Sequence, residues 1–212
     1  MNASYKYPIQ LLREAESEMS KISHAKLFNG PKYRPILEKW AASVFGLGYE
    51  EWVGQCWIRM VERQDDSVDF LLKNDRLEFN FQLTERLNPE RKRGLEYKKL
   101  EKDVILKRPY RPEAGSSLGP LWIKDAVKNK IERYSDKENL NLLVYVNFDA
   151  KSLARDQIIK QLQEFQGKFA SIWLITNQKI CSIFGNNFIG NVEGWGKIST
   201  IIPPQILSYP KN

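Results

Sequence analysis

The stretch SVDFLLKNDRLEFNFQLTE, residues 67–85, predicts a β-hairpin around which the rest of the chain is organised. Two runs of alternating residues flank Asn74-Asp75, a pair that tolerates the backbone conformation of a tight turn. A two-residue turn would place Asp69 opposite Asn80. Because side chains alternate between the two faces of a strand, one face of the hairpin is predicted to be apolar and buried. That face carries Val68, Phe70, Leu72, Leu77, Phe79, Phe81 and Leu83.

The opposite face of the hairpin is almost entirely polar, with Ser67, Asp69, Glu78, Asn80, Gln82 and Thr84. Antiparallel strands commonly expose one face to water, so a solvated surface is one interpretation. Asp and Asn are disfavoured in strands, however, and need another reason to be present. An Asp facing an amide or carboxylate on the next strand is how a divalent metal is held by oxygen ligands. We therefore favour a functional site on this face.

Length and composition indicate a folded protein with one main domain. The chain has 212 residues, of which 42% are hydrophobic and 12% aromatic, enough for a substantial core. The formal net charge of +7 favours a polyanionic partner. The cysteines Cys56 and Cys181 are far apart and are expected to be buried free thiols. A single histidine, His24, argues against a zinc site or a Ser-His-Asp triad.

No feature of the sequence predicts a membrane or secreted protein. No apolar run approaches the roughly 20 residues needed to cross a bilayer, and the N-terminus MNASYKYP lacks a signal-peptide core. We expect a cytoplasmic protein with no membrane association.

A basic segment follows the hairpin. Residues 86–111 hold ten basic and four acidic side chains, nearly the whole charge excess of the chain. A solvated helix face is the usual explanation of a charge run. The imbalance also suits contacts with a nucleic-acid backbone, for which the candidates are Arg91, Lys92, Arg93, Lys98 and Lys99. Residues 108–120, rich in Pro, Gly and Ser, are predicted to be a loop within a basic insertion at about 86–120.

The remaining segments alternate between helix and strand patterns. Helices are predicted at 8–22, from Pro35 to Gly46 or Gly48, at 121–134 and at 152–166, the last capped by Asp149. Buried strands are predicted at 140–148, 171–176 and 180–184, whereas 50–63 fits either pattern. On 121–134 the stripe of Ile123, Val127 and Ile131 faces inward, with Lys124, Lys128 and Lys130 off it. We expect an N-terminal helical extension at 1–34 and, at 35–212, an α/β domain with a mixed central sheet flanked by helices.

The order of elements over 35–176 resembles the core of the PD-(D/E)xK phosphodiesterase superfamily, the restriction-endonuclease-like fold. In that family the hairpin holds the metal site, so the resemblance places Asp69 as the first metal-binding residue. Asn80-Phe81-Gln82 then occupies the place of the family's acidic residue and Lys, with Asn80 a departure from the required carboxylate. Glu78 is a substitute ligand on the same face, and Glu38 matches a Glu that the preceding helix often contributes.

The resemblance implies a metal-dependent DNA endonuclease. Mg²⁺ or Mn²⁺ would be held by Asp69, Glu78 and Asn80, with Gln82 and Glu38 completing the catalytic set. The alternative is a catalytically inactive nuclease-fold protein that binds nucleic acid or a protein partner. A third hypothesis is a globular scaffold protein whose basic loop binds another protein. The sequence is also compatible with a homodimer.

Overall fold

The computed structural model describes residues 4–61, 68–91, 112–133, 139–186 and 188–199. The described strands form one seven-stranded sheet in which the spatial order follows the sequence. The strands are β1 (Trp57–Met60), β2 (Phe70–Lys73), β3 (Glu78–Leu87), β4 (Leu140–Asn147), β5 (Ser171–Ile175), β6 (Lys179–Phe184) and β7 (Gly196–Lys197). The pairs β3–β4 and β4–β5 are parallel and the others antiparallel. The predicted α/β class with a mixed sheet is therefore confirmed.

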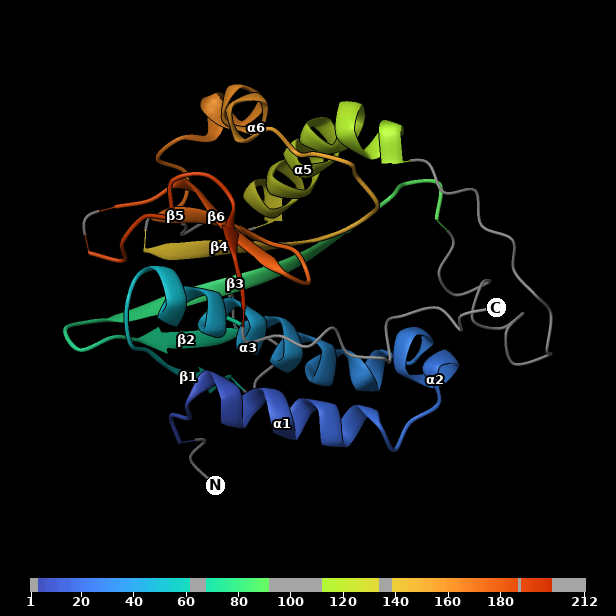
Figure 1. Cartoon of the computed structure of the whole chain (residues 1–212), viewed down its shortest axis with the longest axis vertical. Coiled ribbons are helices and arrows are strands. Elements are labelled where there is room, and N and C mark those ends of the chain that lie inside the picture. The colour runs from blue at the N-terminus through green and yellow to red at the C-terminus, as the bar shows by residue number, and fades with distance from the viewer. Residues whose placement is uncertain (1–3, 62–67, 92–111, 134–138, 187, 200–212) are drawn as a thin grey trace.

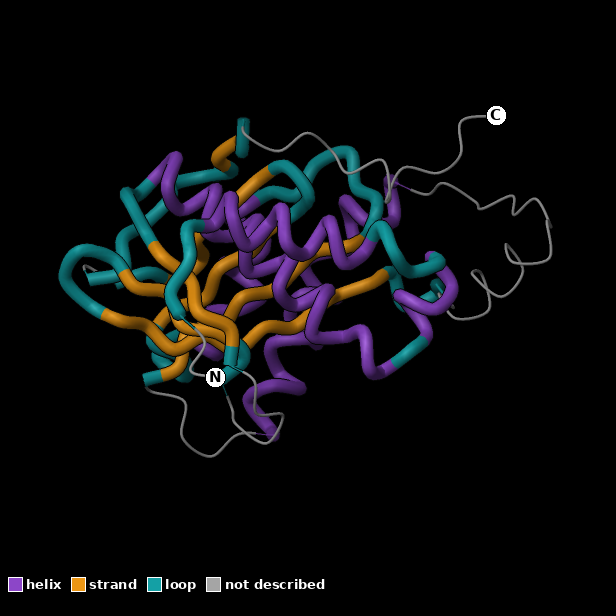
Figure 2. Tube along the Cα trace, turned by 90° about the horizontal axis from the view of Figure 1, so that it is seen from below, coloured by secondary structure: helices purple, strands orange, loops and turns teal. Residues whose placement is uncertain are grey.

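Helices cover both faces of the sheet (Figure 1). They are α1 (Pro8–Met19), α2 (His24–Asn29), α3 (Arg34–Trp52), α5 (Pro112–Arg133) and α6 (Arg155–Leu162), with short 3₁₀ turns η1 (Pro31–Tyr33) and η2 (Gln163–Phe165). Helices α1 and α3 lie on one side of the sheet, and α5 and α6 lie on the other. Figure 2 shows these layers from below, with helices in front of the strands. None of the helices in the described part of the chain is both long and apolar enough to cross a membrane.

Each face of the sheet has its own hydrophobic cluster. On the α1–α3 side the ring of Phe45 lies 5.0 Å from that of Phe81 and 5.5 Å from that of Trp173, measured between centroids. On the α5–α6 side, residues of both helices pack against β4 and β5. Strand β4 contributes to both clusters, through Leu143 on one side and Leu142 on the other. This burial on both faces confirms the prediction that 140–148 contains a buried strand.

Helix α3 runs past the glycines at which its end was predicted. It continues to Trp52, and Gly46 and Gly48 lie inside it. A Cβ atom at Gly46 would come within 2.5 Å of the side chain of Ile58. The glycine therefore permits close packing of helix on strand, not helix termination. The ambiguous segment 50–63 contains the last turn of α3 and strand β1.

Helix α5 begins earlier than predicted, so the predicted loop at 108–120 is helical from Pro112 onward. Gly115 lets this part of α5 pack closely on the chain after β4, because a side chain there would overlap the backbone carbonyl of Asp149. Asp149 is not the helix cap that was predicted. Helix α6 is preceded by Ala154 and ends at Leu162, so it is shorter than the predicted 152–166.

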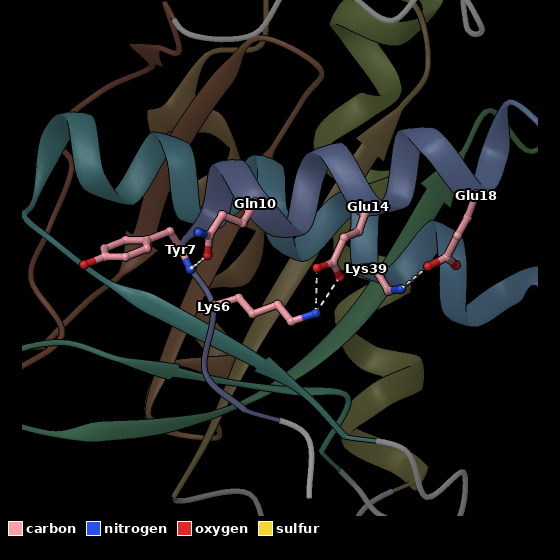
Figure 3. Close-up of polar contacts among 6 residues, drawn as sticks. All are labelled: Lys6, Tyr7, Gln10, Glu14, Glu18 and Lys39. Carbon is pink, nitrogen blue, oxygen red and sulfur yellow. Dashed lines mark hydrogen bonds and ion pairs between the residues drawn. The ribbon is translucent and has the colours of Figure 1, made fainter. Parts of the chain in front are cut away.

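One ion pair lies within the N-terminal segment and another joins it to α3 (Figure 3). The ammonium group of Lys6 contacts both carboxylate oxygens of Glu14, at 2.6 and 2.7 Å. Lys39 on α3 contacts Glu18 on α1 at 2.6 Å. The apolar side of α1, including Leu11, belongs to the same cluster as α3. A domain boundary near residue 34 stays a prediction, but α1 shares its core with the α/β unit.

Candidate functional site

The β2–β3 hairpin has a longer turn than the sequence predicts. Leu71 lies opposite Asn80, and residues 74–77 form the connecting loop. Asn74 organises that loop, because its Oδ1 accepts hydrogen bonds from two backbone N–H groups, each at 2.9 Å. The predicted pairing of Asp69 with Asn80 is therefore wrong by two residues. Since side chains alternate along a strand, a shift of two leaves the side chains of β2 and β3 on their predicted faces. Val68 and Leu77 depart from the prediction, because Val68 packs with the α5–α6 cluster and Leu77 is exposed in the loop.

Asp69 lies just before β2, where the hairpin pairing begins. Its carboxylate accepts a hydrogen bond from the side-chain amide of Gln82 and another, 2.7 Å long, from the backbone N–H of Leu83. The backbone N–H of Asp69 donates to the carbonyl of Phe81 at 2.8 Å. Gln82 itself is almost fully buried. Asp69 thus extends the hydrogen bonding of the hairpin with its own side chain.

Charged side chains from two helices surround this carboxylate. Arg34 and Glu38 come from α3 and Lys130 from α5, and their charges interact with Asp69. Together with Gln82, these residues are the charged cluster. The Nε atom of Arg34 donates to Glu38 at 2.6 Å. The Lys130 residue is only 7% exposed. Two cations therefore face two carboxylates, with Lys130 buried and the side chain of Arg34 largely exposed.

Burial perturbs the three titratable members of the cluster in a coupled way. It raises the pKa of Glu38, and the negative charge of Asp69 raises it further, while Arg34 opposes the shift. Burial also raises the pKa of Asp69, opposed first by the hydrogen bond from Leu83. The pKa of Lys130 is lowered by burial, against the attraction of Asp69. Coupled, desolvated groups of this kind are frequent at functional sites.

A pocket of about 460 Å³ opens beside the charged cluster, between the segment α1–α3 and the ends of β3 and β4. Its wall is mainly apolar and includes Met19, Leu27, Phe28, Leu37, Trp40 and Tyr145. Arg34, Glu38, Glu85 and Asn147 add polar groups to the wall. The amide of Asn147 donates to Glu85 at 2.7 Å. Glu38 and Arg34 therefore belong to both the pocket and the charged cluster.

The structure brings together only part of the predicted catalytic set. Glu38, Asp69 and Gln82 lie in the charged cluster, whereas Glu78 and Asn80 do not. Glu78 accepts a hydrogen bond from the hydroxyl of Tyr5 and is separated from Gln82 by four residues of extended strand, roughly 13 Å. Asn80 is exposed at its side chain. The length of strand between Glu78 and Gln82 thus keeps Glu78 away from Asp69. The shifted register places Asn80 opposite Leu71 and not opposite Asp69.

The predicted magnesium site is not formed by these residues. Asp69, Glu78 and Asn80 do not converge, because the hairpin register places Gln82 beside Asp69. Within the described residues, no three His, Cys, Asp or Glu side chains are grouped so that they could hold a metal ion. Lys130 instead places a positive charge beside Asp69. Binding of Mg²⁺ or Mn²⁺ at other residues stays a prediction that the structure does not test.

The predicted nucleic-acid-binding residues lie largely outside the described part of the chain. Lys92, Arg93, Lys98 and Lys99 lie outside the described residues. Only Arg91 is described, just after β3, where its backbone N–H donates to the carbonyl of Asn88 at 2.9 Å. A nucleic-acid partner and a homodimer stay predictions that the structure does not test.

Lys130 was missed because the sequence places it on a helix rich in lysine. Its spacing contains the signal, however, since it follows Ile123 by seven positions and Val127 by three. Both of these residues are buried on the inward stripe of α5. Positions three and seven residues apart share one helix face. The prediction that Lys130 lies off this stripe is therefore wrong.

Glu38→Gln should change how the stability of the fold depends on pH. The folded state raises the pKa of Glu38, so its contribution to stability is fully present below the ordinary Glu value and is lost as pH rises through the folded pKa. In urea unfolding between about pH 4 and about pH 7, the difference in unfolding free energy between variant and wild type should move in favour of Gln as pH rises. A difference that is constant with pH would contradict the raised pKa.

Comparisons with known proteins yield little. No protein-family model matches the sequence, and no curated protein matches it. A solved structure of a Pseudomonas aeruginosa PAO1 protein of unknown function, described as belonging to the monooxygenase superfamily, is 18% identical, covers 85% of each chain and has a TM-score of 0.42. At this TM-score the likeness assigns neither fold nor activity. No family model supports the predicted PD-(D/E)xK resemblance, and the hairpin keeps Glu78 and Asn80 away from Asp69. The resemblance, the nuclease function and the inactive-nuclease alternative are therefore wrong.

Proposed function

We propose that this protein binds a small organic molecule with a largely apolar body in the pocket between α1–α3 and the ends of β3 and β4. The observation that carries the proposal is the pocket itself. Its volume of about 460 Å³ lies within the range of roughly 300–1,000 Å³ that is usual for small-molecule sites.

The chemistry of the wall supports a ligand of this class. Such sites combine a mainly apolar lining with a few polar groups that orient the ligand. Trp40 and Tyr145 supply aromatic surface, and their rings contact each other edge to face with centroids 5.5 Å apart. Glu38 and Glu85 supply polar groups on opposite elements, α3 and β3. Two of the walls, α3 and the sheet, belong to the main core, so the site is built on rigid elements.

Filling the pocket tests this proposal directly. Leu37→Trp adds volume at a partly buried position on the wall. Leu121→Trp places the same side chain at an exposed leucine on α5, across the sheet. The probe is Nile red, an uncharged apolar dye, whose affinity is measured by fluorescence titration. Leu37→Trp should weaken binding by about tenfold or more, a loss of about 1.4 kcal/mol, and Leu121→Trp should leave the affinity unchanged.

Two outcomes would count against the pocket as the binding site. One is equal affinity of wild type and Leu37→Trp, with circular dichroism showing both folded. The other is a loss of affinity in Leu121→Trp as large as in Leu37→Trp, which would place the dye elsewhere. A wild-type protein that binds no dye at all would also refute the proposal.

A further inference from the structure

Glu38 links the pocket to the charged cluster. It lies on the pocket wall, and its side chain is 19% exposed. On the cluster side it faces Arg34 of its own helix, at 2.6 Å, Asp69 just before β2 and Lys130 of α5. Across the pocket, β3 contributes Glu85.

The wider surroundings of Glu38 carry few other charges within the described residues. On α3 the next charged side chain is Lys39, which pairs with Glu18 of α1 at 2.6 Å. On β3, Arg86 pairs with Asp125 of α5 at 3.5 Å. Both pairs are internally neutral, and Arg133 of α5 adds a positive charge near Lys130. The protonation of Glu38 is therefore governed mainly by the charged cluster and by the contents of the pocket.

The two carboxylates of the cluster have unequal hydrogen-bond donors. Asp69 accepts hydrogen bonds from the amide of Gln82 and from the backbone of Leu83, and both donors favour its ionised form. Glu38 accepts a hydrogen bond from Arg34, which also favours the ionised form, but the Arg34 side chain is 67% exposed, so water screens its charge. When two carboxylates are in different environments, the proton belongs to the one that is less well supplied with donors. Glu38 is that residue.

A ligand in the pocket would increase this difference. It would displace the water that solvates Glu38, and desolvation favours the neutral carboxylic acid over the carboxylate. The neutral acid has an O–H group, which the carboxylate lacks, and can donate it to a hydrogen-bond acceptor on the ligand. A negatively charged ligand group would instead meet two carboxylates on the wall, Glu38 and Glu85, against one cation, Arg34, which is already paired with Glu38.

We infer that the pocket selects an uncharged ligand carrying an acceptor such as a carbonyl oxygen, and that its binding is accompanied by uptake of one proton on Glu38. This inference rests on the proposed small-molecule function and adds the ligand class and a pH control. The raised pKa of unliganded Glu38 is consistent with it, because burial and the charge of Asp69 already shift the equilibrium toward the acid. The sign follows from linkage: affinity is highest below the pKa of unliganded Glu38, falls as pH rises, and levels off above the pKa of the liganded state.

The test measures the affinity of Nile red, which is uncharged and carries a carbonyl oxygen, between about pH 5 and about pH 8. Wild type should bind about tenfold more weakly at the upper end, one pKa unit of linkage being equivalent to a tenfold change. Glu38→Gln keeps a neutral hydrogen-bond donor, so its affinity should be independent of pH and close to that of wild type at low pH. Glu132→Gln, on the exposed side of α5, is the matched control and should retain the wild-type profile.

Asp69→Asn gives a second, independent readout. It removes the negative charge that raises the pKa of Glu38, so the fall in affinity should move to lower pH. Calorimetry in two buffers of different ionisation enthalpy should show proton uptake by wild type and none by Glu38→Gln. Dye binding that is independent of pH in wild type, or that keeps its pH dependence in Glu38→Gln, would overturn the proton link while leaving the pocket intact. Absence of dye binding at every pH would overturn both.

Discussion

Phe81→Ala is expected to lower the free energy of unfolding by about 3–5 kcal/mol. Phe81 is completely buried. Its ring stacks on that of Phe70, with centroids 4.8 Å apart and planes 9° from parallel, and lies 5.0 Å from the ring of Phe45. Truncation would leave a cavity between β3 and α3 that these rigid neighbours cannot close. Urea unfolding followed by circular dichroism measures the loss.

Phe79→Ala provides the matched control. Phe79 lies on the same strand and the same face as Phe81, two residues earlier, but is only partly buried. The two substitutions remove the same side chain and the same strand propensity, so their difference reports burial alone. Phe79→Ala should cost about half as much or less. Equal losses of unfolding free energy for the two variants would contradict the structure, in which Phe81 is inside the hydrophobic cluster on the α1–α3 side and Phe79 lies at its edge.

The faces of the residues in β2 and β3 could be predicted from the sequence, whereas the pairing could not. Alternation alone determines that Phe81 points to the core, and a register shift of two residues does not change it. The pairing depends on the length of the turn. Asn74-Asp75 is compatible with a two-residue turn, but the side chain of Asn74 instead supports the four-residue loop 74–77. Local sequence does not distinguish these two arrangements.

The candidate site was predictable only in part, for a related reason. Asp69 and Gln82 share a hairpin face, and the sequence pattern reveals such a face. Glu38 lies on α3 and Lys130 on α5, and their positions relative to Asp69 depend on how each helix packs on the sheet. The pocket depends on the same packing, because its walls come from segments far apart in the chain. The role of Gly46 could not be predicted for the same reason. A glycine at this position suggests a helix end in the sequence, but in the structure it allows α3 to pack closely on β1.

Asp69→Ala is expected to destabilise the fold by about 3 kcal/mol, although the residue is neither apolar nor fully buried. The substitution leaves the backbone N–H of Leu83 and the amide of Gln82 without their acceptor, and an unsatisfied buried donor costs about 1–3 kcal/mol. It also removes the negative charge that faces Lys130. Denaturant unfolding at neutral pH measures the loss. Asp75→Ala, in the exposed hairpin loop, should change stability by no more than about 0.5 kcal/mol.

The two contributions of Asp69 can be separated by a double-mutant cycle with Lys130. Asp69→Asn keeps an oxygen that can accept from Leu83 and removes only the charge, so it should cost less than Asp69→Ala. Lys130→Met removes the buried ammonium group and keeps most of the side-chain volume. If the two charges stabilise each other, the double variant should be more stable than the sum of the single losses implies, by about 1 kcal/mol or more. Strict additivity would mean that Asp69 acts through its hydrogen bonds to the hairpin alone, and that Lys130 is neutralised by other members of the charged cluster.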